Sequence, residues 1–270
     1  MVSIDAIKEL RERTHLGMTE CKKALEETNN NIEQAIEVLQ KRGLKKVDDQ
    51  VLVLEGRVKA IKNDESTFVA IAEVNCQTDF GAKSEQFNKF VNELLNTKLS
   101  NVDSGDLAKL VYAPIVMIQK QLGEKVVIRR VERRVSEGYF SIYNHNAGNI
   151  AVIAEFELQY DDYFDHVLAD NIAMHIAACK PLSLSRTAMD KDLYAKKINL
   201  FAEEVVNRPE AMRQKIIDGK MDRWCSEIVL LEQQAIFMEG KNTKTIHELL
   251  QERGMVIRSF VRYERGKIIQ

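Results

Sequence analysis

The sequence has few of the features that mark membrane proteins, secreted proteins or metalloenzymes. Only three prolines interrupt its 270 residues, which favours long helices. No apolar run reaches the ~18 to 20 residues of a membrane-spanning helix. Residues Met1–Leu10 form a charged amphipathic segment without the apolar core of a signal peptide. We therefore expect a cytoplasmic protein that has no membrane partner.

Metal and nucleotide signatures are also missing. The four cysteines are isolated from one another and form no CxxC pair, which argues against a zinc site or a redox couple: Cys21, Cys76, Cys179 and Cys225. The five histidines are equally scattered, at His15, His145, His166, His175 and His247. There is no P-loop and no GxGxxG motif. We expect no metal, no cofactor and no nucleotide site in this chain.

Neither sign of charge dominates. Lys and Arg number 39 against 41 Asp and Glu, which gives a formal charge of -2. No global basic field therefore favours direct binding to nucleic acid. The 45% hydrophobic content is ample for the packed core of one large domain or two small ones.

The N-terminal residues 1–44 have the pattern of a three-helix module. Each helix carries an apolar stripe, and the three stripes are Ile4, Ile7 and Leu10, then Met18, Cys21 and Leu25, then Ile32, Ala35, Ile36 and Leu39. Turn and cap residues separate the stripes at Thr14–Gly17, Asn29–Asn31 and Gly43. In size and order the module resembles the ubiquitin-associated type, which binds partner proteins.

After residue 44 the hydrophobic period changes from helical to alternating. We assign residues 45–54 to a charged linker and a first strand, and residues 55–135 to an α+β lobe. Its expected elements are strands at Val51–Val53, Val58–Ala60, Phe68–Val74 and Val126–Val131, turns at Glu55–Gly56 and Asn63–Ser66, and helices at Phe87–Leu95 and Asp106–Leu122. The alternation in Phe68–Val74 predicts a strand that is buried on one face.

The following residues repeat that plan. Residues 136–180 and 230–270 predict a second lobe, with strands at Tyr139–Tyr143, Ile150–Leu158 and Val256–Tyr263 and a helix at Phe164–Ile176. The closing strands are alike, since Val127–Arg133 matches Val256–Arg262 in order and type. The sequence therefore predicts an α+β fold with two related lobes, each built on an antiparallel sheet.

Residues 181–229 predict a protruding antiparallel helical hairpin, a short coiled coil inserted into the second lobe. Its turn is expected at Asn207–Pro209. Two apolar stripes are expected to face each other: Leu193, Ile198, Phe201 and Val205 on one helix, and Met212, Ile216 and Met221 on the other. Trp224 is placed to anchor the base.

Two features raise questions of function. Phe80 is an aromatic residue in what we expect to be a polar loop between a strand and a helix, so it either covers the core or is presented to a partner. His175 and Cys179 lie four residues apart on one predicted helix, a spacing that suits a nucleophile and its base. Their neighbours are mostly apolar, however, which favours ordinary core packing.

Two motifs resemble the elongation factor Ts family, whose members exchange guanine nucleotide on elongation factor Tu. The first is Asn75–Phe80 followed by Ala82-Lys83, and the second is Leu10–Thr14, Gly17-Met18 and Cys21–Leu25. The resemblance extends from Leu10 to about Tyr263. This sequence departs from the family pattern at His15, Leu16 and Thr19, and at Gly81, where valine is usual and where a glycine is expected to loosen the Phe80 loop.

The resemblance implies a non-enzymatic translation factor that binds elongation factor Tu·GDP and promotes GDP release by disturbing the magnesium and phosphate site. It implies that Thr78, Asp79 and Phe80 meet the G domain of that partner, with Phe80 entering near the magnesium. Other positions that match family contacts are Arg11, Met18, Glu20, Lys22, Leu122, Gly123 and His175. Phe237 and Met238 match a pair that faces another domain of the partner.

Two other readings stay open. One is a binding scaffold that uses the N-terminal module and the hairpin to hold proteins without changing nucleotide affinity. The other is a cysteine-dependent enzyme built on His175 and Cys179. The sequence does not decide whether the chain forms a homodimer.

Overall fold

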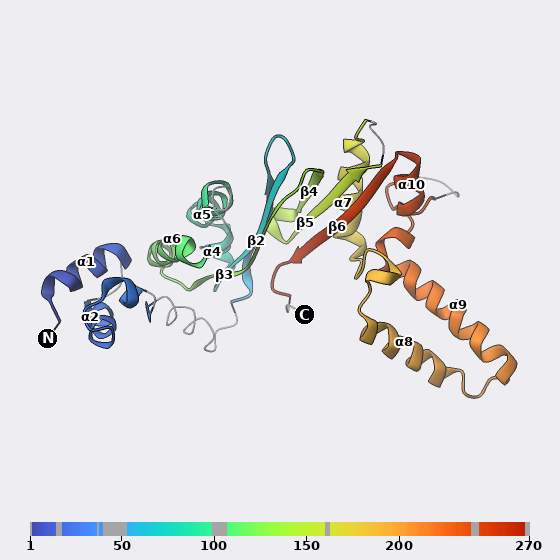
Figure 1. Cartoon of the computed structure of the whole chain (residues 1–270), viewed down its shortest axis with the longest axis horizontal. Coiled ribbons are helices and arrows are strands. Elements are labelled where there is room, and N and C mark those ends of the chain that lie inside the picture. The colour runs from blue at the N-terminus through green and yellow to red at the C-terminus, as the bar shows by residue number, and fades with distance from the viewer. Residues whose placement is uncertain are drawn as a thin grey trace.

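The computed structural model describes residues 2–14, 18–36, 38–39, 53–98, 107–159, 163–238 and 243–267. Within these ranges two three-stranded antiparallel sheets form the centre, and helices lie outside them (Figure 1). The fold is α+β, as the sequence predicts.

The first sheet has the strand order β1-β2-β3, formed by β1 (Glu55–Lys62), β2 (Phe68–Cys76) and β3 (Val126–Val135). Its outer face is covered by α5 (Glu85–Glu93), the π-helical turn η1 (Leu94–Lys98) and α6 (Leu107–Leu122). The apolar stripe of α5 enters this core through side chains that are almost fully buried: Phe87, Phe90, Val91, Leu94 and Leu95.

The second sheet repeats the arrangement, with the order β4-β5-β6 for β4 (Tyr139–His145), β5 (Ile150–Leu158) and β6 (Met255–Glu264). A 3-10 turn, η2 (Asn146–Gly148), joins the first two strands. Its outer face is covered by α7 (His166–Cys179) and α10 (Ile246–Glu252). Thr245 caps α10 in a capping box with Glu248.

The inner faces of the two sheets pack against each other. This shared core contains Val58, Ala60, Val69 and Ile71 from the first sheet and Phe140, Ala151, Ile153 and Tyr263 from the second. The prediction of a strand buried on one face is therefore wrong for β2, whose residues from Val69 to Cys76 are all buried. Helices cover one side of this strand, and the second sheet covers the other.

The relationship between the lobes extends to an irregularity in their sheets. In β2 the register with β3 shifts after Glu73, which leaves Arg129 as the extra residue on the closing strand. In β5 the register with β6 shifts after Glu155 and leaves Arg258 extra. Since Arg129 and Arg258 occupy matching places in the two closing strands, both lobes carry the same β-bulge, which supports an internal duplication.

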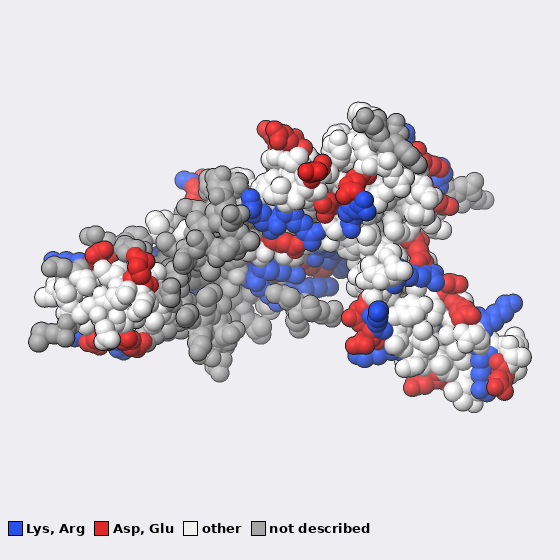
Figure 2. All heavy atoms as spheres, viewed as in Figure 1, with Lys and Arg blue, Asp and Glu red and all other residues white. Residues whose placement is uncertain are grey.

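Arginine and glutamate side chains connect the two sheets. Glu73 is fully buried, and its carboxylate lies 2.7 Å from Arg130 Nε and 3.3 Å from Arg129 Nη1. Arg130 also donates to the carbonyl of Glu264 and lies 4.0 Å from the centre of the Tyr263 ring. Figure 2 shows basic side chains gathered across the middle of this face with acidic ones among them. Arg129 and Arg130 are therefore paired with Glu73 inside the molecule.

The predicted turn at Glu55–Gly56 is wrong, because both residues lie in β1 and pair with Cys76 and Asn75. Gly56 has φ 138°, and a Cβ there would lie 2.1 Å from the Val74 carbonyl oxygen. The glycine therefore permits a close approach between strands rather than a reversal of the chain. Of the predicted strand before it, only Val53 is described, and it is not part of a strand.

The N-terminal residues form α1 (Ile4–Thr14) and α2 (Met18–Glu27), and residues 32–36 and 38–39 are also helical. Their apolar stripes meet in a small core of Leu10, Cys21, Ala24, Leu25, Ala35 and Leu39. The likeness to ubiquitin-associated modules stays a prediction. The predicted boundary at residue 44 lies outside the described residues.

The hairpin consists of α8 (Lys191–Glu204) and α9 (Glu210–Ile228), with Pro209 capping the second helix at the predicted turn. Its contact is made by Ile198, Phe201, Val205, Ile216 and Met221 as expected, together with Tyr194 and Ile217. Leu193 and Met212 are 39% and 55% exposed, so their assignment to the contact is wrong. Trp224 packs against both the hairpin contact and a second apolar cluster at the base, which contains Met189, Cys225 and Val229.

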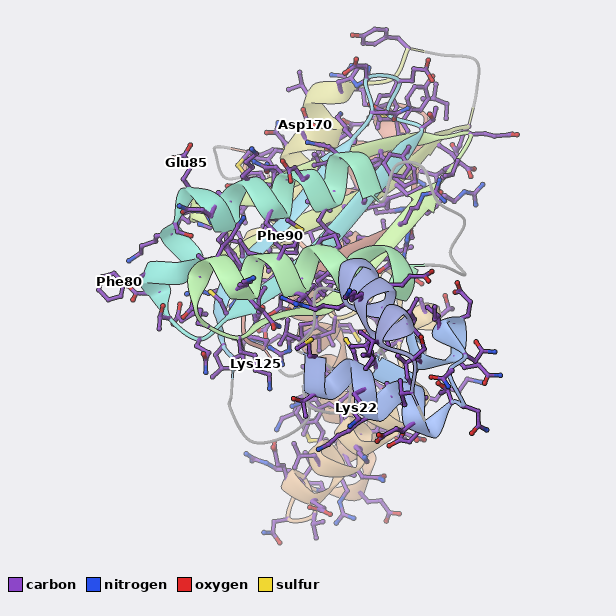
Figure 3. The ribbon with its side chains drawn as sticks, turned by 90° about the vertical axis from the view of Figure 1, so that its left-hand side faces the viewer. Lys22, Phe80, Glu85, Phe90, Lys125 and Asp170 are labelled. Atoms are coloured by element: carbon purple, nitrogen blue, oxygen red, sulfur yellow. The ribbon has the colours of Figure 1, made fainter. Side chains whose placement is uncertain are left out.

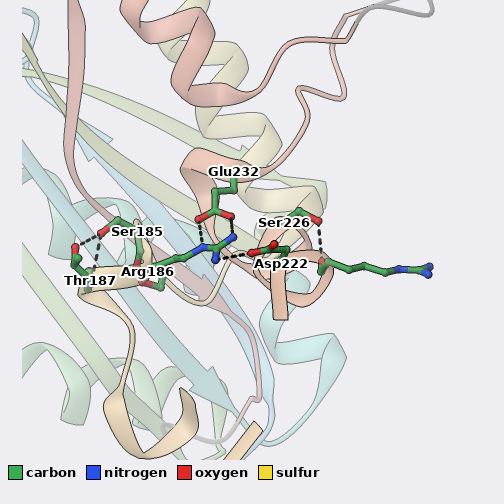
Figure 4. A network of polar contacts seen from close by, with 9 residues as sticks. Ser185, Arg186, Thr187, Asp222, Ser226 and Glu232 are labelled. Atoms are coloured by element: carbon green, nitrogen blue, oxygen red, sulfur yellow. Dashed lines mark hydrogen bonds and ion pairs between the residues drawn. The ribbon is translucent and has the colours of Figure 1, made fainter. Parts of the chain in front are cut away.

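A polar network holds the base of the hairpin to the second lobe (Figure 4). Arg186, in the 3-10 turn η3 (Arg186–Ala188), donates to both carboxylate oxygens of Glu232 at 2.7 Å. It also donates to Asp222 of α9 at 2.8 Å. Glu232 lies in η4 (Leu230–Glu232), which follows α9. One guanidinium therefore links the turn before the hairpin, its second helix and the turn after it.

Candidate functional site

Phe80 lies in a short helix rather than in the predicted loop. The helix α4 (Asp79–Lys83) begins at Thr78, whose hydroxyl accepts a hydrogen bond from the Gly81 N–H at 3.0 Å. Ser84 ends it by donating to the Gly81 carbonyl at 2.7 Å. The same hydroxyl accepts from the Phe87 N–H and so begins α5. A five-residue helix is thus closed at both ends by side chains.

The side chain of Phe80 is 83% exposed. Figure 3 shows it projecting from the end of α4, away from the ribbon. Its neighbours Gly81 and Ala82 are buried beneath it, so the helix is anchored while the ring is presented to solvent. The alternative that Phe80 covers the core is wrong.

The two charged residues of α4, Asp79 and Lys83, form an ion pair with each other beside Phe80. The Lys83 ammonium lies 2.8 Å from the Asp79 carboxylate, one helical turn away. Its hydrogen bond holds the pKa of Asp79 below the usual value. Asp79 is therefore ionised at neutral pH, and the Phe80 ring stands beside an ion pair rather than beside an isolated charge.

The turn between α6 and β3 lies next to α4. Gln77, just before α4, accepts a hydrogen bond from the Lys125 N–H at 3.0 Å. Leu122 is half-buried against the first core, while Gly123 is exposed with φ 70°, a conformation that favours glycine. The structure thus brings together Thr78, Asp79, Phe80, Leu122 and Gly123, and we call this group the α4 site.

Gly81 packs closely against Glu124, and the expected loosening of the α4 site stays a prediction. A Cβ on Gly81 would lie 1.6 Å from Oε1 of Glu124, so the glycine makes room for that carboxylate. The Glu124 oxygen is buried and has no hydrogen-bond partner. Burial, with Glu124 nearby, raises the pKa of the Cys76 thiol to about 12. The Cys76 thiol is therefore protonated at neutral pH, and the space beside Gly81 is closely filled by the Glu124 side chain.

The N-terminal candidates lie on the first two helices. Arg11 of α1 is exposed, and Met18 at the start of α2 is 59% exposed. Lys22 is exposed as well and lies 3.9 Å from Glu26, one turn along α2. Glu20 is on α2, but its side chain lies outside the described residues, as do His15 and Leu16. The described candidates are thus surface groups.

His175 differs from the other candidates because its side chain is fully buried. Its Nε2 lies 2.9 Å from Oε1 of Gln233, and its Nδ1 lies 3.4 Å from the backbone nitrogen of Ile236. The ring is covered by its neighbours in this structure, and its role at a partner interface stays a prediction.

Phe237 and Met238 are only partly exposed and pack against the second core. The Phe237 ring meets the His175 ring edge to face at 6.3 Å between centres. The prominent apolar side chain of this segment is Ile236, which is 57% exposed.

Comparison with known proteins places these groups in a family. The profile described as Elongation factor TS matches residues 77–267, which begin at the α4 site and include β3 of the first sheet and all three strands of the second. Elongation factor Ts of Thioalkalivibrio sulfidiphilus is 36% identical, and the alignment covers 100% of this chain and 94% of the relative. The chain belongs to the elongation factor Ts family. Elongation factor Ts of Clostridium perfringens, at 35%, and of Halothermothrix orenii, at 33%, also align with all of this chain.

Membership of the elongation factor Ts family makes this chain a translation elongation factor and confirms the resemblance drawn from the two motifs. The family profile starts at Gln77 and therefore leaves out the N-terminal helices. The alignments with whole relatives include them. The individual contact residues are not tested by these matches and stay predictions.

Cys179 Sγ lies 3.7 Å from His175 Nδ1, so the structure brings the predicted pair together, but the pKa of neither group is shifted as that of an activated thiol and its base would be. Burial raises the pKa of the Cys179 thiol, whereas nucleophilic thiols have lowered values. Burial also lowers the pKa of His175, so its ring is neutral at pH 7. Among the described residues, no three His, Cys, Asp or Glu side chains are placed to hold a metal ion. No helix in the described ranges has the length and hydropathy to cross a bilayer.

Proposed function

We propose that this chain is a guanine-nucleotide exchange factor that binds elongation factor Tu·GDP and accelerates the release of GDP. Membership of the elongation factor Ts family supports the proposal. The observation that carries it is Phe80, which is 83% exposed on a helix with a buried base. Such a factor acts in the cytoplasm, where translation takes place, and needs no nucleotide site of its own.

The mechanism is a linkage between two binding events. If the factor binds the nucleotide-free partner more tightly than the GDP form, GDP and factor each weaken the binding of the other by the same ratio. A ratio of about a thousand corresponds to ~4 kcal/mol of differential contact. In a GTPase much of the nucleotide affinity comes from the phosphate-binding loop and from a magnesium ion held in near-ideal octahedral geometry. A small displacement of these groups therefore lowers the affinity for GDP.

The α4 site is suited to produce that displacement. An aromatic side chain that enters an apolar cleft buries a large area and is typical of residues that dominate binding energy. Caps at Thr78 and Ser84 fix α4 before any partner arrives, so little ordering is lost on binding. Leu122 and Gly123 lie beside the helix and extend the surface.

The test is release of a fluorescent GDP analogue from a bacterial elongation factor Tu. We expect this protein to accelerate release by orders of magnitude, and Phe80→Ala to reduce that acceleration at least tenfold because the inserted ring is lost. Tyr163→Ala is a matched control, since Tyr163 is an aromatic residue with the same 83% exposure. Equal effects of the two substitutions would refute the role of Phe80.

The scaffold alternative makes a different prediction. A scaffold that uses the N-terminal module and the hairpin would be recovered with its partner in a pull-down, but GDP release would stay at the spontaneous rate. The same release assay therefore separates the two functions.

A further inference from the structure

Arg57 of β1 holds the end of α4 through a single hydrogen bond. Its Nε donates to the carbonyl oxygen of Ala82 at 3.1 Å. Ala82 lies in the last turn of α4, where carbonyl groups have no partner within the helix. A charged donor therefore satisfies a helix-terminal acceptor two residues after Phe80, and such bonds are stronger than those between neutral groups.

Arg57 has no acidic partner in the part of the chain that the structure describes. Its side chain is partly buried, and burial lowers the pKa of the guanidinium, which stays protonated. A partly buried charge without a counter-ion costs folding free energy that its hydrogen bonds must offset. For stability alone, an aliphatic side chain would serve nearly as well here. The arginine therefore calls for an explanation other than folding.

The second lobe supports the stem of Arg57. A Cβ on Gly148 in the turn η2 would lie 3.0 Å from Arg57 Cβ and 3.1 Å from its Cγ, so the glycine lets this turn approach the stem closely. Asn144 of β4 fixes β1 nearby. It accepts from the Ala60 N–H at 2.8 Å and donates to the Ala60 carbonyl at 3.0 Å. Arg57 is thus in contact with both the second lobe and α4.

These contacts form a path from the second lobe through Arg57 to Phe80. Ala82, which accepts the bond, is buried, whereas Phe80 two residues earlier is 83% exposed. Because α4 has only five residues, a bond at its last turn fixes the orientation of the whole helix and so the direction of the ring. Binding residues that are held by locked neighbours lose little freedom when they meet a partner.

We propose that Arg57 is a positioning residue for Phe80 and that it sets the direction in which the ring is presented to elongation factor Tu. This inference rests on the proposed function. It adds to the α4 site a residue from β1 that acts through α4 and needs no contact with the partner. Its influence falls on the rate at which a bound partner releases GDP.

The experiment measures fluorescent GDP release from elongation factor Tu as the concentration of this protein is varied. Arg57→Met keeps an aliphatic stem but removes the donor. The maximal rate should fall about fivefold, while the half-saturating concentration stays within about twofold of the wild type. The midpoint of urea unfolding should change little, because no ion pair is lost. Arg57→Lys keeps a charged donor and should retain at least about half of the maximal rate.

Arg213→Met is the matched control. Arg213 Nε also donates to a backbone carbonyl, that of Arg208 beside the hairpin turn, at 2.8 Å. This variant should have the maximal rate of the wild type. In the Phe80→Ala background, Arg57→Met should cause no further loss, because Arg57 acts through that ring.

A second variant leaves Arg57 in place. Gly148→Ala would press on the stem of Arg57 and should lower the maximal rate by about twofold, since packed side chains transmit such a displacement. Gly266→Ala is its control. Gly266 also has a positive φ, 73° against 92° for Gly148, but a Cβ there would meet Leu54 instead of Arg57. Gly266→Ala should therefore keep the wild-type rate.

The outcomes are distinguishable. If the wild type does not accelerate release, the proposed function fails. If it does and Arg57→Met has the wild-type maximal rate, or lowers the rate equally in the Phe80→Ala background, the positioning role is wrong. It is also wrong if Arg57→Met lowers the unfolding midpoint and Arg57→Lys does not restore the rate, because Arg57 then has a general structural role. Should Arg57→Met fail to fold, equal rates for Gly148→Ala and Gly266→Ala would overturn the proposal.

Discussion

At the scale of single residues, the environment decides what a side chain can do, and the sequence shows that environment only in part. Phe80 was ambiguous in the sequence because an aromatic residue between a strand and a helix suits both a core and an interface. Its exposure resolves the question. The apolar neighbours of His175 favoured its burial, but its hydrogen-bond partner Gln233 lies 58 residues away, so no local pattern could reveal that contact.

Gly81 provides a prediction at this scale. Alanine is favoured over glycine in a helix by about 1 kcal/mol, but its Cβ would collide with Glu124 Oε1. In the wild-type background, Gly81→Ala must displace that carboxylate, so its gain in unfolding free energy should be smaller than in the Glu124→Ala background. The difference should be about 1 kcal/mol, measured by urea unfolding of the four proteins. Equal effects in both backgrounds would show that the two groups do not compete for the same space.

At the scale of helices and strands, hydrophobic periodicity predicted the long elements correctly. It did not predict the short helix α4 or the burial of β2 on both faces. The hairpin turn at Pro209 and the matching closing strands followed directly from the sequence. The five residues of α4 are too few to show a helical period. The alternation in β2 could not reveal burial on both faces, because its second cover comes from a sheet formed later in the chain.

The base of the hairpin gives the prediction for this scale. Arg186→Ala removes a bidentate pair with Glu232 and a bond to Asp222, and we expect it to lower the unfolding free energy by about 1 kcal/mol. Arg223→Ala, which removes a 3.6 Å pair with Glu227 on the exposed side of α9, should cost less than about 0.5 kcal/mol. Thermal unfolding of both variants measures the difference. A smaller loss for Arg186→Ala than for Arg223→Ala would contradict the linking role.

At the scale of the whole molecule, two duplicated sheets share one inner core and one buried ionic network. The sequence predicted the two lobes, but it did not predict that they pack face to face. That packing depends on Val69, Ile71, Phe140 and Ile153, whose partners lie in the other lobe. It makes the two sheets one continuous core in the centre of the molecule.

Glu73 gives the prediction for the whole molecule. Its carboxylate pairs with Arg129 and Arg130 and accepts from the Gly266 N–H at 2.8 Å, so Glu73→Ala leaves charged and polar groups unpaired between the sheets. We expect a loss of about 3 kcal/mol of unfolding free energy in a single transition. Glu65→Ala, in the exposed turn before β2, should change it by less than about 0.5 kcal/mol. A small effect of Glu73→Ala would show that the network does not hold the sheets together.

The central claim is that this protein promotes nucleotide release through the ring of Phe80. Its most direct test is stopped-flow measurement of fluorescent GDP release from elongation factor Tu with saturating wild-type protein, with Phe80→Ala and with Tyr163→Ala. The account predicts acceleration by orders of magnitude for the wild type and for Tyr163→Ala, and at least about a tenfold loss of that acceleration for Phe80→Ala. Release at the spontaneous rate with the wild type, or full acceleration with Phe80→Ala, would contradict it.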